Sequence, residues 1–99
     1  MAKKEIIWTL KAIQDKLEIL DYWITNNKSK TFSERLDQLF DKAIEKLQFQ
    51  AELGKKTDYK NIRIVIVRHY LVYYLIRDQH IEVVRIWDAR RNPKKFIVS

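Results

Sequence analysis

The chain has 99 residues and a formal net charge of +7, and it contains one glycine, one proline and no cysteine. Ninety-nine residues fit a single domain, residues 1–99, that is long enough to bury one hydrophobic core. The lack of cysteine excludes disulfides, a thiol nucleophile and cysteine-ligated metal sites, and it agrees with a reducing compartment.

The first residues, MAKKEIIWTLKAI, include two lysines but no long apolar run. A signal peptide needs an apolar stretch of about 7–15 residues, and a membrane-spanning helix needs about 18 or more. We therefore expect a cytoplasmic protein that makes no use of a membrane.

Positive charge is concentrated in the second half of the chain. Residues 1–53 hold nine Lys or Arg and nine Asp or Glu, whereas residues 54–99 hold eleven and four. A surface that is basic on one side attracts nucleic acid or an acidic protein. The alternative is a solvated surface that merely keeps the protein soluble.

The first predicted element is a strand at Glu5–Trp8, where β-branched and aromatic residues follow one another. Thr9 comes next and is a suitable N-cap, because its hydroxyl can accept an N–H of the first helical turn. Apolar residues then recur at helical spacing from Ile13 to Ile24, which predicts the first helix.

A second helix is predicted after the polar segment TNNKSKTF. Either Thr31 or Ser33 is its expected N-cap, and Thr31 with Glu34 fits a capping box. Apolar residues recur at regular i, i+3, i+4 and i+7 intervals from Leu36 to Leu47, and the opposite face is charged. Two amphipathic helices joined by a short loop predict a helical hairpin.

The segment ELGKKTDYKN is predicted to be a loop in which Gly54 ends the second helix. Three strands rich in Val, Ile and Tyr follow it, separated by turn-like breaks. Their predicted bounds are Ile62–Val67, Tyr70–Ile76 and Ile81–Trp87. The middle strand is nearly all apolar and is expected to be buried on both faces.

These elements predict an α+β fold of two layers in the order β-α-α-β-β-β, with the helical hairpin packed on one face of a small antiparallel sheet. Arg63 and Arg85 each lie one residue from strong core formers, so we expect them on the open face of the sheet or at its rim. The final cations would emerge beside that face and complete a basic site. They are Arg90, Arg91, Lys94 and Lys95.

Several motifs resemble the RelE/ParE toxins of bacterial type II toxin–antitoxin systems, and the resemblance covers nearly the whole chain. They are Trp8–Thr9 with Ala12, Leu20–Asp21–Tyr22, the hairpin VRHYLVYYLI, and above all IEVVRIWDARRNPKKF, which is similar to the family's last strand and Arg-x-Asn-Pro tail. The element order predicted from periodicity is also the order that this family uses.

The resemblance implies a growth-inhibiting toxin, of the kind involved in plasmid stabilisation, that a cognate antitoxin holds inactive. RelE-like members cleave mRNA in the ribosomal A site, whereas ParE-like members inhibit DNA gyrase and are not nucleases. A non-toxic, small RNA-binding module of the same fold is a third hypothesis. In each case an acidic, partly disordered partner segment is expected to cover the basic face by helix docking or strand addition.

An mRNA interferase needs a base, a cation and an acid around the scissile phosphate. The family's tail arginine corresponds to Arg90, but its strand arginine falls at Leu71 and its late tyrosine or histidine falls at Phe96. Arg85 and Lys56 are the cations that would complete a catalytic set with Arg90. Because Leu71 offers no charge and Phe96 no proton, this departure favours a ParE-like protein or a divergent nuclease.

The residues predicted to bind nucleic acid or a partner are ten of the eleven cations of the second half, with one loop aromatic and one turn histidine. They are Lys55, Lys56, Tyr59, Lys60, Arg63, Arg68, His69, Arg85, Arg90, Arg91, Lys94 and Lys95. The tyrosines of the middle strand are expected to pack in the core rather than stack on bases. No metal site and no cofactor are expected, because no paired carboxylates or cysteines accompany the histidines.

Overall fold

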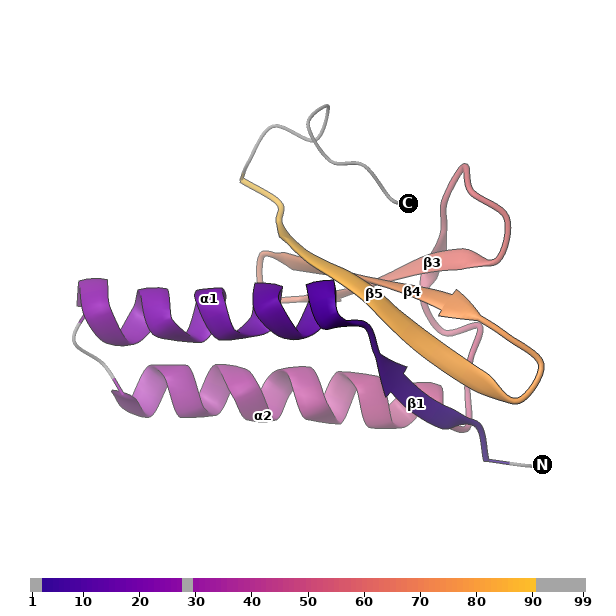
Figure 1. Cartoon of the computed structure of the whole chain (residues 1–99), viewed down its shortest axis with the longest axis horizontal. Coiled ribbons are helices and arrows are strands. Elements are labelled where there is room, and N and C mark those ends of the chain that lie inside the picture. Colours follow the sequence, from indigo (N-terminus) through magenta and orange to yellow (C-terminus); the bar gives the residue numbers. More distant parts are fainter. Residues whose placement is uncertain (1–2, 28–29, 91–99) are drawn as a thin grey trace.

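The structure is a computed structural model that describes residues 3–27 and 30–90. Its elements in chain order are β1 (Glu5–Trp8), α1 (Leu10–Asn27), α2 (Lys30–Leu47), β2 (Lys55–Lys56), β3 (Ile62–Val67), β4 (Tyr70–Ile76) and β5 (His80–Asp88). The two helices form a hairpin that packs against the sheet (Figure 1), which confirms the predicted α+β fold. Neither helix combines the length and the apolar character that a membrane crossing requires.

The sheet has five strands in the order β1-β5-β4-β3-β2. β1 pairs in parallel with β5, and every other pair is antiparallel, so the sheet is mixed rather than wholly antiparallel. The predicted bounds of β3 and β4 are confirmed, and β5 extends one residue further at each end. The short strand β2 lies in the segment predicted to be a loop, where Lys55 pairs with Ile64 and Lys56 with Arg63.

The hydrophobic core lies between the helical hairpin and one face of the sheet, and α1 contributes Ala12 to it. From α2 come fully buried side chains such as Leu36 and Phe40, and from the sheet come Val72 and Val83. Burial in β4 alternates, with every second residue buried and the others half-buried. The prediction that both faces of this strand are fully buried is therefore wrong, because the helices cover one face only.

The N-terminus of α1 is capped as predicted. The backbone N–H of Ala12 donates to Thr9 Oγ1 over 3.1 Å, and the Thr9 hydroxyl donates to the carbonyl of Val84 over 3.1 Å. One hydroxyl therefore satisfies the helix end and ties it to β5.

The predicted caps of α2 are wrong, because the helix begins at Lys30 and both Thr31 and Ser33 fall inside it. Ser33 is buried, and its hydroxyl donates to the carbonyl of Leu20 over 3.0 Å. Its role is to join the two helices of the hairpin, which satisfies a backbone acceptor near the end of α1.

Gly54 does not end a helix, since α2 ends at Leu47 and no glycine has a positive φ. Its backbone instead approaches the sheet so closely that a Cβ would lie 2.6 Å from the Ile64 carbonyl oxygen and 2.7 Å from Tyr74 Oη. The Gly54 N–H donates to Tyr74 Oη over 2.9 Å, and that hydroxyl donates to the Ala51 carbonyl over 2.7 Å. Glycine is required here for close packing of the loop on β3 and β4.

The face of the sheet that the helices leave open is apolar rather than basic at its centre. Arg63 shares the helix-side face with Val65 and Val67 by strand alternation, and its Nη1 donates to the carbonyls of Glu52 and Gly54 over 3.2 and 2.8 Å. The prediction that Arg63 populates the open face is therefore wrong, although it does lie at the rim. The open face carries paired apolar side chains, among them Ile64, Ile66, Leu71, Tyr73 and Trp87.

Candidate functional site

Apart from Arg85, which lies on β5, the predicted site residues within the described part of the chain separate into two groups at opposite ends of β3. Near its start lie Lys55, Lys56, Tyr59, Lys60 and Arg63, which we call the loop group. Beyond its end lie Arg68 and His69, next to Arg90, because Tyr70 pairs with Asp88. Arg68, His69 and Arg90 are called the hairpin group below. At about 3.3 Å per residue, the six residues of β3 place these groups about 17 Å apart. Arg91, Lys94 and Lys95 lie outside the described residues.

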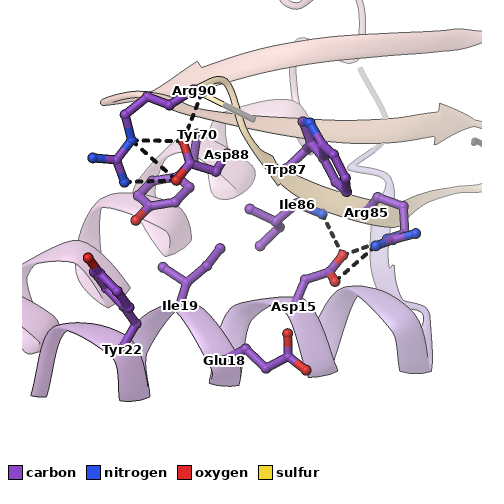
Figure 2. A pocket seen from close by; sticks show the side chains of 10 residues that line it. All are labelled: Asp15, Glu18, Ile19, Tyr22, Tyr70, Arg85, Ile86, Trp87, Asp88 and Arg90. Atoms are coloured by element: carbon purple, nitrogen blue, oxygen red, sulfur yellow. Dashed lines mark hydrogen bonds and ion pairs between the residues drawn. The ribbon is translucent and has the colours of Figure 1, made fainter. Parts of the chain in front are cut away.

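A groove with a volume of about 310 Å³ runs between α1 and the second half of β5 (Figure 2). Two of the three predicted catalytic cations, Arg85 and Arg90, lie in this groove. Carboxylates and aromatic rings surround them. The lining residues are Asp15, Glu18, Ile19, Tyr22, Tyr70, Arg85, Ile86, Trp87, Asp88 and Arg90.

Arg85 is held by Asp15 from the facing helix. Asp15 Oδ2 accepts from Arg85 Nε over 2.7 Å and from the backbone N–H of Ile86 over 3.0 Å, and Asp15 Oδ1 accepts from Arg85 Nη2 over 3.2 Å. β1 pairs with β5 only as far as Val83. Beyond that point the Ile86 N–H at the edge of β5 has no strand partner, and the Asp15 carboxylate accepts its hydrogen bond. This bidentate, half-buried contact joins α1 to the sheet.

Arg90 is held by Asp88, two residues before it. Asp88 Oδ1 accepts from the Arg90 backbone N–H over 2.9 Å and from Nε over 3.0 Å, while Oδ2 accepts from Nη2 over 2.8 Å. These bonds from Arg90 hold the pKa of Asp88 below its usual range. These bonds form an ordered turn at Asp88 and Arg90. The Arg90 side chain is 57% exposed, so its guanidinium still reaches solvent.

Two tyrosines line the groove in different environments. Tyr70 is buried, its hydroxyl accepts from Trp23 Nε1 over 2.8 Å, and burial raises its pKa. Tyr22 is exposed and packs edge-on against Trp23, with ring centroids 5.4 Å apart. Tyr22 is therefore the aromatic ring of the groove that a partner can reach, whereas Tyr70 is part of the core.

The hairpin between β3 and β4 consists of Arg68 and His69. Arg68 has a φ of 59°, a conformation that non-glycine residues rarely adopt. The His69 carbonyl accepts from the Ala89 N–H over 2.8 Å, which places the hairpin beside Arg90. The His69 ring lies 4.4 Å from the Tyr70 ring, and no described group bonds to its buried Nε2.

All members of the loop group except Lys55 line a second hollow, with a volume of about 470 Å³. Tyr59 is exposed there, as expected for an aromatic in this loop. Glu52 and Asp58 also line the hollow, so its charge is mixed. The Arg63 guanidinium, which binds the two loop carbonyls described above, stabilises the loop that carries the lysines.

Lys56 does not approach the other two predicted catalytic cations. It lies on β2, which β3 and β4 separate from β5. Three strand spacings of about 4.8 Å put β2 roughly 14 Å from β5 across the sheet. Within residues 3–27 and 30–90, no group of three or more His, Asp or Glu side chains is arranged to hold a metal ion.

Sequence reasoning missed Asp15 as a site residue and used Tyr22 only as part of a family motif. Asp15 contacts Arg85 across 70 positions of sequence, and no local pattern signals such a contact. Tyr22 follows Ile19 by three residues on the same side of α1, so helical periodicity could have placed it beside the groove.

Comparisons with known proteins agree with this fold. The family model described as "ParE toxin of type II toxin-antitoxin system, parDE" matches residues 6–93. A solved structure from P. aeruginosa, titled "Chromosomal ParDE TA system", superposes with a TM-score of 0.77 at 16% identity, covering 89% of this chain and 98% of that one. At that identity the likeness shows the fold alone. A comparison with curated proteins finds no match.

Proposed function

The chain belongs to the family of ParE toxins of type II toxin–antitoxin systems, and from this premise we propose that it arrests growth by binding DNA gyrase, without nuclease chemistry. The observation that carries the proposal is the dispersal of the three candidate catalytic cations. Arg85 and Arg90 are each bound by a carboxylate, and Lys56 lies across the sheet from both.

The groups that remain near Arg90 are poorly suited to proton transfer at neutral pH. Asp88 has a lowered pKa, so at neutral pH its carboxyl group is ionised and has no proton to donate. Tyr70 is buried and has a raised pKa, so at neutral pH its hydroxyl keeps its proton and the phenolate that would act as a base is not formed. Leu71, where the related nucleases carry an arginine, is half-buried between Ile66 and Trp87. A general acid and a general base with matched pKa values are what RNA cleavage would require.

The hairpin group is the surface that we assign to the target. Arg68 occupies a left-handed conformation that glycine would adopt at lower cost, and such local strain is typical of functional positions. Arg90 presents an exposed, pre-oriented guanidinium beside it, and Tyr22 adds an accessible ring. An exposed arginine pair with an aromatic neighbour is typical of protein-binding surfaces.

An antitoxin is the second partner that we propose. The net charge of +7 and the exposed cations of the hairpin group favour an acidic segment. If that segment is partly disordered when free, it folds on binding and covers the surface that otherwise meets gyrase. Both partners act in the bacterial cytoplasm, which is therefore the proposed location.

The test compares the wild type with Arg90→Ala, and uses Lys42→Ala on the exposed side of α2 as the matched control. We expect induced expression to arrest growth, and the purified protein to inhibit supercoiling by gyrase. Both effects should be lost in Arg90→Ala and kept in Lys42→Ala, while primer extension detects no new mRNA ends.

Two other results would overturn the proposal. New cuts in translated mRNA that disappear in Arg90→Ala would assign RelE-like cleavage instead. Absence of growth arrest, combined with RNA binding by the purified protein, would assign a non-toxic RNA-binding module.

A further inference from the structure

The groove between α1 and β5 contains one carboxylate whose charge nothing in the groove balances. Arg85 is bound to Asp15, and Arg90 is bound to Asp88, so four of the five charged lining residues form two ion pairs. The fifth is Glu18, which is exposed and has no bonding partner within residues 3–27 and 30–90. The groove therefore has a net negative charge, although the whole chain has a net charge of +7.

The neighbours of Glu18 on α1 do not balance its charge either. Residues three or four positions apart lie side by side on a helix. At these spacings from Glu18 lie Gln14, Asp15, Asp21 and Tyr22, none of which is a cation. Like charges at this spacing disfavour a helix, and a cation from outside the chain would remove that cost.

An apolar surface leads along the groove to this carboxylate. Ile19 and Tyr22 line the groove from α1, next to Glu18, and Ile86 lines it from β5 (Figure 2). The Tyr22 side is accessible, because this residue is 48% exposed. Ligand pockets have volumes of roughly 300–1,000 Å³, so the 310 Å³ of this groove suit a single long side chain. A side chain with an apolar stem and a cationic head fits such a surface.

We propose that the groove binds an arginine side chain of DNA gyrase, with the guanidinium at Glu18 and the stem along Ile19 and the Tyr22 ring. The inference rests on the proposed function and names the group of the target that the toxin recognises. Arginine fits better than lysine, because its planar guanidinium can bond to a carboxylate through two N–H groups and can stack on an aromatic ring. Arginine is also among the residues that contribute most to binding at protein interfaces.

The charge of the groove favours the target over the antitoxin as the source of this arginine. The groove is continuous with the hairpin group, because Arg90 belongs to both, so a target that meets the hairpin group also reaches the groove. The acidic segment proposed for the antitoxin is attracted to the cations of the hairpin group but is repelled by Glu18.

The first test measures binding of the full chain to purified gyrase by biolayer interferometry. Glu18→Gln keeps the shape of the side chain and removes one charge-assisted contact, so we expect the dissociation constant to rise about tenfold. The rise should lie mainly in the dissociation rate, whereas a carboxylate that only steers the partner would change the association rate. Glu34→Gln on the exposed side of α2 removes the same charge elsewhere and should leave both rates unchanged.

The second test identifies the group that lies beside Glu18. A benzophenone attached to Glu18→Cys, the only thiol in this otherwise cysteine-free chain, should crosslink to a gyrase peptide that contains arginine. The same label at Glu34→Cys should give no crosslink to gyrase. Tyr22→Phe should bind as the wild type does, whereas Tyr22→Ala should bind more weakly. The effects of Tyr22→Ala and Glu18→Gln should be less than additive, because both residues contact the same side chain.

The outcomes separate this inference from the proposed function. Wild-type binding to gyrase that Glu18→Gln leaves unchanged, or changes only in the association rate, would refute the inference alone. A loss of affinity for the antitoxin but not for gyrase would refute it too, and would assign the arginine to the antitoxin. A wild-type protein that does not bind gyrase would refute the proposed function and this inference with it.

Discussion

Replacing Asp15 by alanine tests the contact that closes the groove between α1 and β5. The variant removes both bonds to Arg85 and leaves the N–H of Ile86 without its acceptor. An unsatisfied buried donor costs about 1–3 kcal/mol. Loss of a fully buried ion pair costs about 3–5 kcal/mol, but Arg85 keeps 23% of its side chain exposed, which reduces this part. We expect a total loss of about 2–3 kcal/mol in the free energy of unfolding.

The assay is urea denaturation followed by tryptophan fluorescence and circular dichroism. With a slope of about 1–1.5 kcal/mol per molar urea for a chain of this size, the midpoint should fall by roughly 2 M. Asp15→Asn keeps one oxygen that can accept from the Ile86 N–H and should lose about half as much. Glu18→Ala, three residues along the same helix and exposed, is the matched control and should stay within about 0.5 kcal/mol of the wild type. An Asp15→Ala protein as stable as this control would refute the structural role assigned to Asp15.

Three further predictions concern the ends of the sheet and the turn at Arg90. Arg68→Gly should stabilise the protein by about 0.5–1 kcal/mol, because glycine adopts a φ of 59° without strain, and a lower melting temperature would contradict this. Gly54→Ala should destabilise it by about 2–3 kcal/mol in the same urea assay, since the added Cβ would lie 2.6 Å from a backbone oxygen; a neutral effect would show that the loop can move away. Because the pKa of Asp88 lies below its ordinary value of 3.8 in the folded state, its contribution to stability is complete above that pH and is lost as pH falls through the folded pKa. The stability difference between the wild type and Asp88→Asn should therefore shrink in acid, and a difference independent of pH would exclude the contact with Arg90 as its cause.

The sequence was most informative where local pattern and tertiary environment agree. β3 and β4 were predicted to the residue, because their β-branched and aromatic runs end at a two-residue turn. β2 was missed because two lysines carry no strand signal, and they pair only because Arg63 and Gly54 bring the loop onto the sheet. The parallel pairing of β1 was also missed, since strand direction depends on the path through the helical hairpin.

The sequence suggested which cations belong to a candidate site but not how the fold arranges them. A count of cations suggested one basic surface on the open face of the sheet. The register of β3 and β4 instead places the loop group and the hairpin group at opposite ends. Arg63 and Arg85, which look like free cations in sequence, bind backbone carbonyls and Asp15 respectively. Their partners lie too far away in the chain for any local pattern to reveal.

The two ends of the sheet therefore differ in what they contribute. At the loop end, Arg63 and Tyr74 satisfy loop backbone groups, and substitution there should reduce stability first. At the hairpin end, Arg68 adopts a strained φ and Arg90 remains exposed, so substitution there should cost little stability or even increase it. A toxin that binds its target through the hairpin end should consequently lose activity in Arg68→Gly while it gains stability. A nuclease that depended on cations from both ends would lose activity with substitutions at either one, and the comparison of Arg68→Gly with Lys56→Ala separates these two cases.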